Sequence, residues 1–189
     1  MKIICMNLVI TGNPGVGKHT ITEYIQKKNP EYQVLDINKF AIDEKLVQKE
    51  QESFEVDVGL LKTRISDKIS NNSLIVGHLA PYVLNKSDVD LVIVLRKNPY
   101  DLIDIYTSRN YSEQKSKENT GSEILGIIVN DSISAFGKEK TYQVDTTSKT
   151  PEQVIGIIDE IIKGKSDGDQ IDWLSLVKEK NDFNRFFDY

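Results

Sequence analysis

The chain contains 189 residues, with 24 lysines and arginines against 29 aspartates and glutamates, a net charge of −5 and an isoelectric point near 5.2. This length is enough for one domain with a sizeable core, and the acidic balance argues against a broad basic surface for nucleic acid, although it leaves room for a local patch. The single cysteine, Cys5, excludes a disulfide framework and fits a reducing cytoplasm. The first apolar run is too short to span a membrane and leads directly into a glycine-rich loop, so we expect a cytoplasmic protein without a membrane partner.

The glycine-rich loop joins an apolar run at residues 3–10, which predicts a buried strand, to a helical pattern at residues 17–28. Gly12 and Gly17 bracket four residues before Lys18, which is the spacing of a Walker A loop. In such a loop the backbone N–H groups turn toward an anion, the lysine adds a charge, and the helix directs its positive end at the same phosphates. We therefore predict an ATP-binding loop rather than a plain Gly-Pro turn, formed by Gly12, Asn13, Gly15, Val16, Gly17, Lys18, His19 and Thr20.

His19 stands where this pattern normally has a serine or threonine that coordinates magnesium, and its imidazole is poorly matched to that cation. Thr20 is a candidate metal ligand, but one residue further along a helix is a rotation of about 100°, so it does not automatically replace the missing hydroxyl. His19 could donate to a phosphate or face solvent. We expect magnesium to be held mainly by the nucleotide phosphates and water.

The next elements indicate a site for a second substrate. Residues 32–35 predict a short strand that ends at Asp36, residues 38–50 an amphipathic helix, and residues 51–55 a polar loop. Asp36 would lie at the carboxyl end of its strand, where open α/β sheets bind ligands, or would simply cap the following helix. A further helix begins after Asp57, which either caps it or helps to hold a base, and Arg64 lies away from its apolar stripe.

The strand Ser73–Val76 and the loop at residues 77–81 lack an expected feature. Proteins that hydrolyse nucleotides usually place a carboxylate here to organise magnesium and water, and Val76 and Gly77 offer none. His78 is the only titratable group in the loop. A lone histidine is often structural, but its position at the ligand-binding edge of the sheet favours a functional role.

Residues 89–95 predict a fourth buried strand with Arg96 at its exit, followed by a helix at Pro99–Ser108. Residues 109–120 are polar and rich in lysine, which is typical of a mobile lid over phosphates. We expect Arg109 to help neutralise the charge of the transferred group. The chain has only four arginines. Arg96 and Arg109 could therefore serve bidentate phosphate contacts, or form ordinary surface salt bridges.

The remaining residues complete the sheet and add a tail. Residues 118–138 predict one long helix, residues 141–144 a fifth strand whose exit could turn toward a purine, and Pro151–Ile162 a last crossover helix. Residues beyond Gly164 predict a flexible linker, and a helical pattern rich in aromatic residues resumes at Ile171. This tail either packs back on the domain, which we favour, or docks a partner.

Four segments together resemble the adenylate kinase isoenzyme 6 family, including its archaeal members, over roughly residues 3–163: the loop at 12–20, Val94-Leu95-Arg96, Arg109-Asn110-Tyr111 and Glu123-Ile124-Leu125. The resemblance implies an α/β three-layer P-loop fold with a five-stranded parallel sheet. It also implies phosphoryl transfer from ATP to AMP, some ATPase activity and, as in eukaryotic relatives, maturation of the small ribosomal subunit through a ribosomal protein.

Position by position, Gly15, Gly17, Lys18, His19 and Thr20 match the family's ATP loop, and His78 matches the histidine of its Asp-x-His signature. The aspartate of that signature aligns with Val76. Residues 36–59 match the segment that binds the nucleoside monophosphate, and residues 109–119 match the lid. The monophosphate-binding candidates are Asp36, Lys39, Phe40, Asp57 and Arg64. Residues 1–163 would form the kinase-like domain, and residues 164–189 a linker with a helical appendage.

We therefore predict a phosphotransferase of the adenylate kinase type in which Lys18, Arg96 and Arg109 neutralise the transferred group, with His78 beside them and no general base required. An alternative is a nucleotide-gated ribosome-assembly factor with little kinase activity. The missing carboxylate and the aromatic tail favour that alternative. A kinase for a different small acceptor would differ only in the segment that binds the second substrate.

Overall fold

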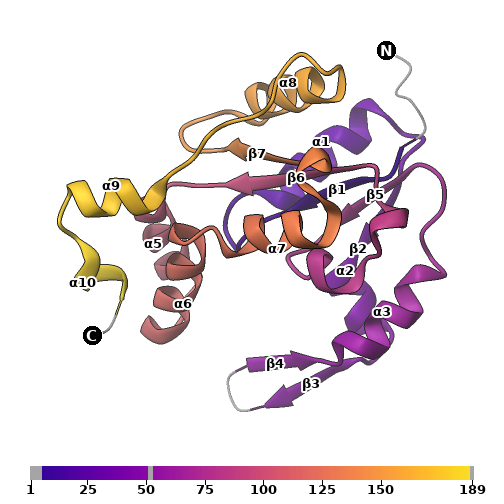
Figure 1. Cartoon of the computed structure of the whole chain (residues 1–189). Coiled ribbons are helices and arrows are strands. Elements are labelled where there is room, and N and C mark those ends of the chain that lie inside the picture. The colour runs from indigo at the N-terminus through magenta and orange to yellow at the C-terminus, as the bar shows by residue number, and fades with distance from the viewer. Residues whose placement is uncertain (1–5, 51–52, 188–189) are drawn as a thin grey trace.

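The computed structural model describes residues 6–50 and 53–187, which form a five-stranded parallel sheet between layers of helices (Figure 1). The strand order is β2-β5-β1-β6-β7. Their bounds are β1 (Leu8–Thr11), β2 (Gln33–Asp36), β5 (Ser73–Val76), β6 (Leu91–Arg96) and β7 (Thr141–Asp145). The three central strands are buried along their whole length, as expected for a parallel sheet that is covered on both faces. The predicted α/β three-layer fold is confirmed.

Alternate residues of the central strands face opposite layers of helices. Leu8 and Ile10 of β1 belong to one apolar cluster, and Val9 belongs to the other. The first cluster is covered by α1 (Lys18–Lys28), α5 (Pro99–Ser108) and α8 (Pro151–Ile162). The second is covered by α2 (Ile37–Asp43), α3 (Val58–Ser66), α4 (Ala80–Val83) and α7 (Ile127–Phe136). Two short 3-10 helices, Lys86–Asp88 and Lys138–Lys140, precede β6 and β7.

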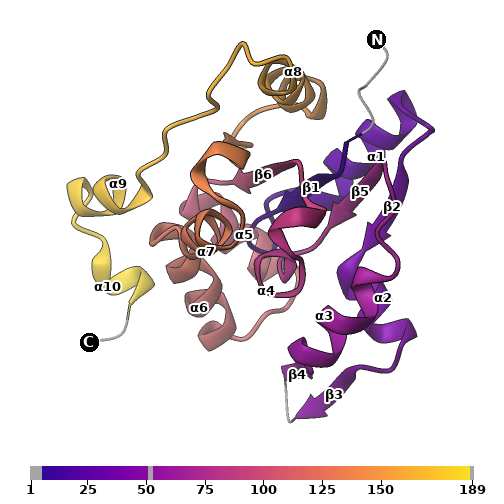
Figure 2. The ribbon, with the colours of Figure 1, turned by 45° about the vertical axis from the view of Figure 1, so that its right-hand side comes forward.

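The helix predicted at residues 38–50 is wrong in its second half. Helix α2 ends at Asp43, and β3 (Val47–Glu50) pairs antiparallel with β4 (Ser53–Val56) in a hairpin that extends beyond α3 (Figures 1 and 2). The chain turns at Lys45, whose φ is 56°, and the β-branched Val47 and Val56 lie opposite each other. The predicted polar loop at 51–55 is therefore partly strand, while residues 51–52 lie outside the described residues.

The single helix predicted at residues 118–138 is also wrong. Helix α6 (Glu113–Ile124) is separated from α7 by Gly126, whose φ of 64° belongs to the left-handed region. Most of the predicted lid is helical, because α6 begins at Glu113 behind a Ser112 cap. In the first predicted strand, Met6 and Asn7 precede β1, which begins at Leu8. Residues 1–5, with Cys5, lie outside the described residues.

The C-terminal tail packs on α5 and α6, where both figures place it (Figures 1 and 2). It contains α9 (Trp173–Glu179) and α10 (Phe183–Phe186). Val177 and Phe186 are 0% and 1% exposed and pack against Ile124 of α6. The segment predicted as a flexible linker follows the edge strand β7, where the Asp169 amide donates to the Gln143 carbonyl at 2.8 Å. The tail is therefore part of the packed domain.

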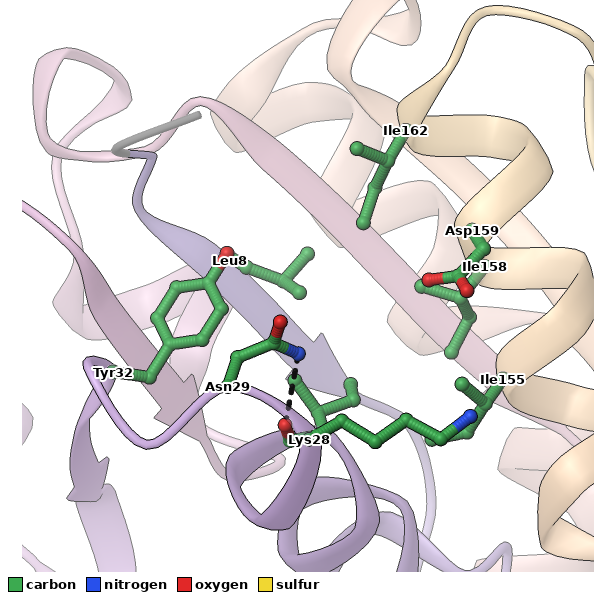
Figure 3. Close-up of a pocket in the computed structure, with 9 residues that line it drawn as sticks. Leu8, Lys28, Asn29, Tyr32, Ile155, Ile158, Asp159 and Ile162 are labelled. Carbon is green, nitrogen blue, oxygen red and sulfur yellow. Dashed lines mark hydrogen bonds between the residues drawn. The ribbon is translucent and has the colours of Figure 1, made fainter. Parts of the chain in front are cut away.

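A cavity of about 170 Å³ lies between α1 and α8 (Figure 3). Its lining includes Leu8 at the start of β1, Asn29 at the end of α1 and Ile162 at the end of α8. These positions place the cavity at the end of the sheet opposite the glycine-rich loop, so it is distinct from the predicted nucleotide site. No helix in the described part of the chain is long and apolar enough to cross a membrane.

Candidate active site

The glycine-rich loop connects the carboxyl end of β1 to the start of α1. Gly12 has a φ of 134°, and a Cβ there would collide with the carbonyl oxygen of Leu95 on the neighbouring β6. Gly17, with a φ of 96°, caps α1 without a side chain of its own, so the N–H groups of the first turn are unobstructed. This geometry suits a phosphate bound at a helix N-terminus.

Lys18 lies inside this loop rather than in solvent. It is 7% exposed, and its Nζ donates to the carbonyl oxygens of Gly12 and Asn13, each at 2.8 Å. Burial, together with the positive charge of Arg109, lowers the pKa of Lys18 from 10.5 to about 8. The loop therefore holds a cation that is short of compensating negative charge, which is the property that a phosphate-binding site requires.

Arg109 ends helix α5 and is exposed. The end of α5 lies beside the loop, because the Tyr106 hydroxyl donates to the Pro14 carbonyl at 2.7 Å. Among the described residues the guanidinium of Arg109 has no ion-pair partner. It is therefore available to an incoming anion. Its charge acts on Lys18, whose pKa it helps to lower.

His19 and Asp36 connect the ATP loop to the segment predicted for the second substrate. His19 Nε2 lies 2.9 Å from Asp36 Oδ2, and Asp36 Oδ1 accepts from the amides of Asn38 and Lys39 at 2.9 and 3.0 Å. Asp36 is thus the N-cap of α2, one of its two predicted roles, and it also pairs with His19. Thr20 is exposed on the first turn of α1.

His78 follows β5 and shares the site with Lys18. Burial lowers the pKa of His78 from 6.5 to about 4, and the charge of Lys18 contributes to this change. The imidazole is therefore neutral at pH 7. Next to it Gly77 passes so close to Ile37 that a Cβ at Gly77 would lie 2.8 Å from the Cβ of Ile37, which fixes the loop against α2.

The remaining monophosphate-binding candidates lie on α2 and α3. Arg64 Nη1 donates to Glu44 Oε2 at 2.6 Å, and both side chains are partly solvent-exposed. Asp57 is the N-cap of α3 and accepts from the Leu60 amide at 2.9 Å. Lys39 is exposed, whereas Phe40 packs partly into the core. The structure thus gives Asp57 a capping role and leaves Lys39 open to solvent.

Arg96 is held in a buried ion pair beside the loop. It is 3% exposed, and its Nε and Nη2 donate to the carboxylate and the carbonyl of Glu123 at 2.7 and 2.6 Å. Its Nη1 donates to Gln143 Oε1 at 2.5 Å. This arrangement differs from the expectation that Arg96 neutralises the transferred group, because its charge is matched by a buried carboxylate.

Two residues next to the loop were not identified as site candidates. Glu123, at the end of α6, is 0% exposed, and its Oε2 accepts from Asn13 Nδ2 at 2.8 Å. Thr146, after β7, donates its hydroxyl to the Val16 carbonyl at 3.1 Å. Each acts across a sequence separation of more than a hundred residues, so no local spacing could have indicated it. The one available signal was the place of Glu123 in a motif shared with the resembled family.

The donor set does not fit a magnesium ion held by the protein. The two usual ligand positions carry an imidazole that pairs with Asp36 and the apolar Val76, which is 1% exposed. Within the described residues, no group of three acidic, histidine or cysteine side chains could hold a metal ion.

Comparison with solved structures identifies the fold. A shikimate kinase from Bacteroides thetaiotaomicron has a TM-score of 0.56 at 15% identity and covers 84% of this chain and 98% of its own. A thymidylate kinase from Candida albicans has a TM-score of 0.52 at 14% identity and covers 88% of this chain and 95% of its own. The fold is that of the P-loop kinases.

Sequence comparison narrows this class. The family described as an AAA domain matches residues 8–126. A protein of Saccharolobus solfataricus named "Putative adenylate kinase" is 35% identical over 177 residues, which cover 92% of this chain and 90% of that protein. A protein of the same name from Thermococcus gammatolerans is 32% identical, with coverage of 92% and 96%. The chain belongs to the P-loop nucleoside monophosphate kinase family, which confirms the resemblance inferred from its motifs.

Proposed function

We propose that this protein is a cytoplasmic adenylate kinase-like phosphotransferase that transfers the γ-phosphoryl group of ATP to AMP. One observation carries the proposal: the ammonium of Lys18 is buried in the loop, bonded to the carbonyls of Gly12 and Asn13. Arg109, which has no ion-pair partner among the described residues, lies at the end of α5, beside the same loop. The His19–Asp36 contact supports it, because it joins the ATP loop to the segment proposed to bind AMP, residues 36–59. The curated relatives bear a kinase name that agrees with this assignment.

The residues of the chain would act by positioning and charge neutralisation. Lys18 exchanges its two backbone carbonyl partners for phosphate oxygens of ATP, while the amides at the start of α1 hold the same phosphates. Arg109, at the start of the proposed lid (residues 109–119), adds the second positive charge. Neutral His78 can hydrogen-bond a phosphate or AMP without competing for charge.

The acceptor needs no general base, because the phosphate of AMP is already ionised at neutral pH. One of its oxygens attacks the γ-phosphorus as the bond from that phosphorus to the β-phosphate oxygen breaks, and two molecules of ADP result. Lys39 and Arg64 are the cations proposed to bind the phosphate of AMP. Arg64 would exchange its hydrogen bond to Glu44 for one to that phosphate. Magnesium would arrive with ATP, coordinated by phosphates and water.

The experiment is ADP production by the purified protein from ATP and magnesium, with and without AMP. A strong AMP-dependent rate that Lys18→Ala abolishes is the expected result. Full activity in Lys18→Ala would overturn the site, and a rate indifferent to AMP would overturn AMP as the acceptor.

A second candidate is a nucleotide-gated factor in maturation of the small ribosomal subunit, with a small-subunit ribosomal protein as its partner. The observation that favours it is Val76, an apolar residue where relatives of the resembled family carry the carboxylate that organises water and metal. This candidate predicts AMP-independent or negligible turnover, together with nucleotide-dependent co-sedimentation with small ribosomal subunits. Co-sedimentation that is unaffected by ATP and ADP would contradict it.

A further inference from the structure

The carboxylate of Glu123 connects the nucleotide loop to the C-terminal tail. Its Oε2 accepts from Asn13 Nδ2 in the loop at 2.8 Å, and its Oε1 accepts from Trp173 Nε1 at the start of α9 at 3.1 Å. Arg96 Nε and the Lys97 amide donate to the same Oε1 at 2.7 and 3.1 Å. One buried carboxylate therefore holds the ATP loop, the end of β6 and the tail at the same time.

Three polar atoms of Asn13 have hydrogen-bond partners: both ends of its side-chain amide and its backbone carbonyl oxygen. The end of α6 holds both ends of the side-chain amide, since Ser122 Oγ donates to Asn13 Oδ1 at 3.0 Å while Asn13 Nδ2 donates to Glu123. Its backbone carbonyl accepts from Lys18 Nζ at 2.8 Å. A phosphate that draws Lys18 away would take this partner from the peptide of Asn13, the residue whose side-chain amide is bonded to Glu123.

We propose that Glu123 and Trp173 are positioning residues for the nucleotide site, so that the Trp173–Glu123 hydrogen bond and nucleotide binding are thermodynamically coupled. This inference rests on the proposed nucleotide binding at the loop. It goes further by assigning the tail a role in nucleotide affinity. Coupling is reciprocal: if the Trp173 hydrogen bond favours the binding-competent loop, then nucleotide must change the surroundings of Trp173.

A second contact supports the coupling. The segment that leads to the tail is fixed at Gln143, whose carbonyl accepts from the Asp169 amide at 2.8 Å. The side chain of Gln143 accepts from Arg96 Nη1 at 2.5 Å, and Arg96 is the buried cation that balances Glu123. The tail thus reaches the Arg96–Glu123 pair from both sides, and movement of the tail would disturb both partners.

The first test uses Trp173→Phe, which keeps an aromatic ring to pack beside α6 and removes the N–H donor together with part of the indole. We expect the Kd for ADP, measured by calorimetry, to rise about fivefold or more. The matched control is Tyr100→Phe, which removes another hydrogen bond of the tail, from Tyr100 Oη to Asp182 Oδ2 at 2.8 Å, and does not involve Glu123. The control should lose a similar amount of thermal stability and bind ADP normally. Equal Kd values for Trp173→Phe and the wild type would overturn the proposal, as would an equal loss of affinity in the control.

The second test needs no variant of the tail, because Trp173 is the only tryptophan of the chain. ADP should change its fluorescence along a saturable curve with the calorimetric Kd, and Asn13→Ala at saturating ADP should lose the change. Unaltered emission in wild-type protein that calorimetry shows to bind ADP would overturn the coupling alone. Absence of ADP binding by calorimetry would instead overturn the proposed function, and the coupling with it.

Discussion

Nucleotide binding should depend on pH through Lys18, because a lysine with a lowered pKa loses its charge at moderately alkaline pH. Burial and the neighbouring Arg109 bring the pKa of Lys18 from 10.5 to about 8 in the nucleotide-free site. This change corresponds to about 3 kcal/mol of lost stabilisation of the ammonium. Phosphates in the loop restore a negative partner and should return the pKa of Lys18 to its ordinary range.

The sign and size of the effect follow from these two pKa values. Nucleotide binds the protonated lysine, so affinity is full below pH 8 and falls as pH rises, until the pKa of the bound state is reached. The Kd for ADP should be about tenfold higher at pH 9 than at pH 7, and binding at pH 8 should take up about half a proton. His78, with a pKa of about 4, does not titrate in this window.

Calorimetry in two buffers of different ionisation enthalpy measures both the Kd for ADP and the number of protons taken up on binding. The control is Lys18→Arg, whose guanidinium stays charged over the whole range and so reports the ionisation of ADP alone. A wild-type Kd that is constant from pH 7 to pH 9, with no proton uptake at pH 8, would refute the argument that burial has destabilised the ammonium.

Three further predictions concern the surroundings of the loop. Arg96→Met leaves Glu123 buried without its cation and should lower the free energy of unfolding, measured in urea, by about 3–5 kcal/mol. The double variant Arg96→Met with Glu123→Gln should lose less of this free energy. Equal losses in the two variants would contradict a strong ion pair. The His78 imidazole, followed by NMR, should remain neutral in the folded protein until pH falls to about 4. The unfolded state takes up this proton at a higher pH, so the free energy of unfolding should decline as pH falls from 6.5 to 4. Titration of His78 near pH 6.5 in the folded protein would contradict its burial. His19→Thr places a hydroxyl at the position where the loop pattern has a magnesium ligand. The Kd for ADP, measured by calorimetry with magnesium or with a chelator, should then be several-fold more sensitive to magnesium than in the wild type. Unchanged sensitivity would contradict a ligand role for a hydroxyl at this position.

Features that depend on neighbouring residues could be predicted from the sequence. The apolar runs that end at Ile10, Val76 and Leu95 identified the buried strands, and the spacing of Gly12, Gly17 and Lys18 identified the loop between a strand and a helix. The carboxyl ends of these strands meet at one edge, so the position of the site followed from topology.

The errors in the fold have local causes that compete with periodicity. Residues 38–50 have helical spacing of apolar residues, but the left-handed Lys45 ends α2 and the β-branched Val47 starts a strand with a partner. In residues 118–138 apolar side chains continue on both sides of Gly126. Their spacing therefore predicts one helix, although Gly126 separates two. In both cases the helical spacing of apolar side chains continues past a residue with a left-handed backbone, Lys45 or Gly126, at which the helix itself ends or breaks.

The site residues that could not be predicted are those whose role depends on charge balance between distant segments. Arg96 had the residue type and the position of a phosphate ligand, but only the packed structure shows that Glu123, from a helix later in the chain, already satisfies it. Since that pair is neutral as a whole, the positive charge at the proposed nucleotide site comes chiefly from Lys18 and Arg109. Lys18 is fixed in the loop, whereas Arg109 is exposed at the start of the proposed lid. Affinity for a triphosphate should therefore depend on how closely Arg109 approaches the loop.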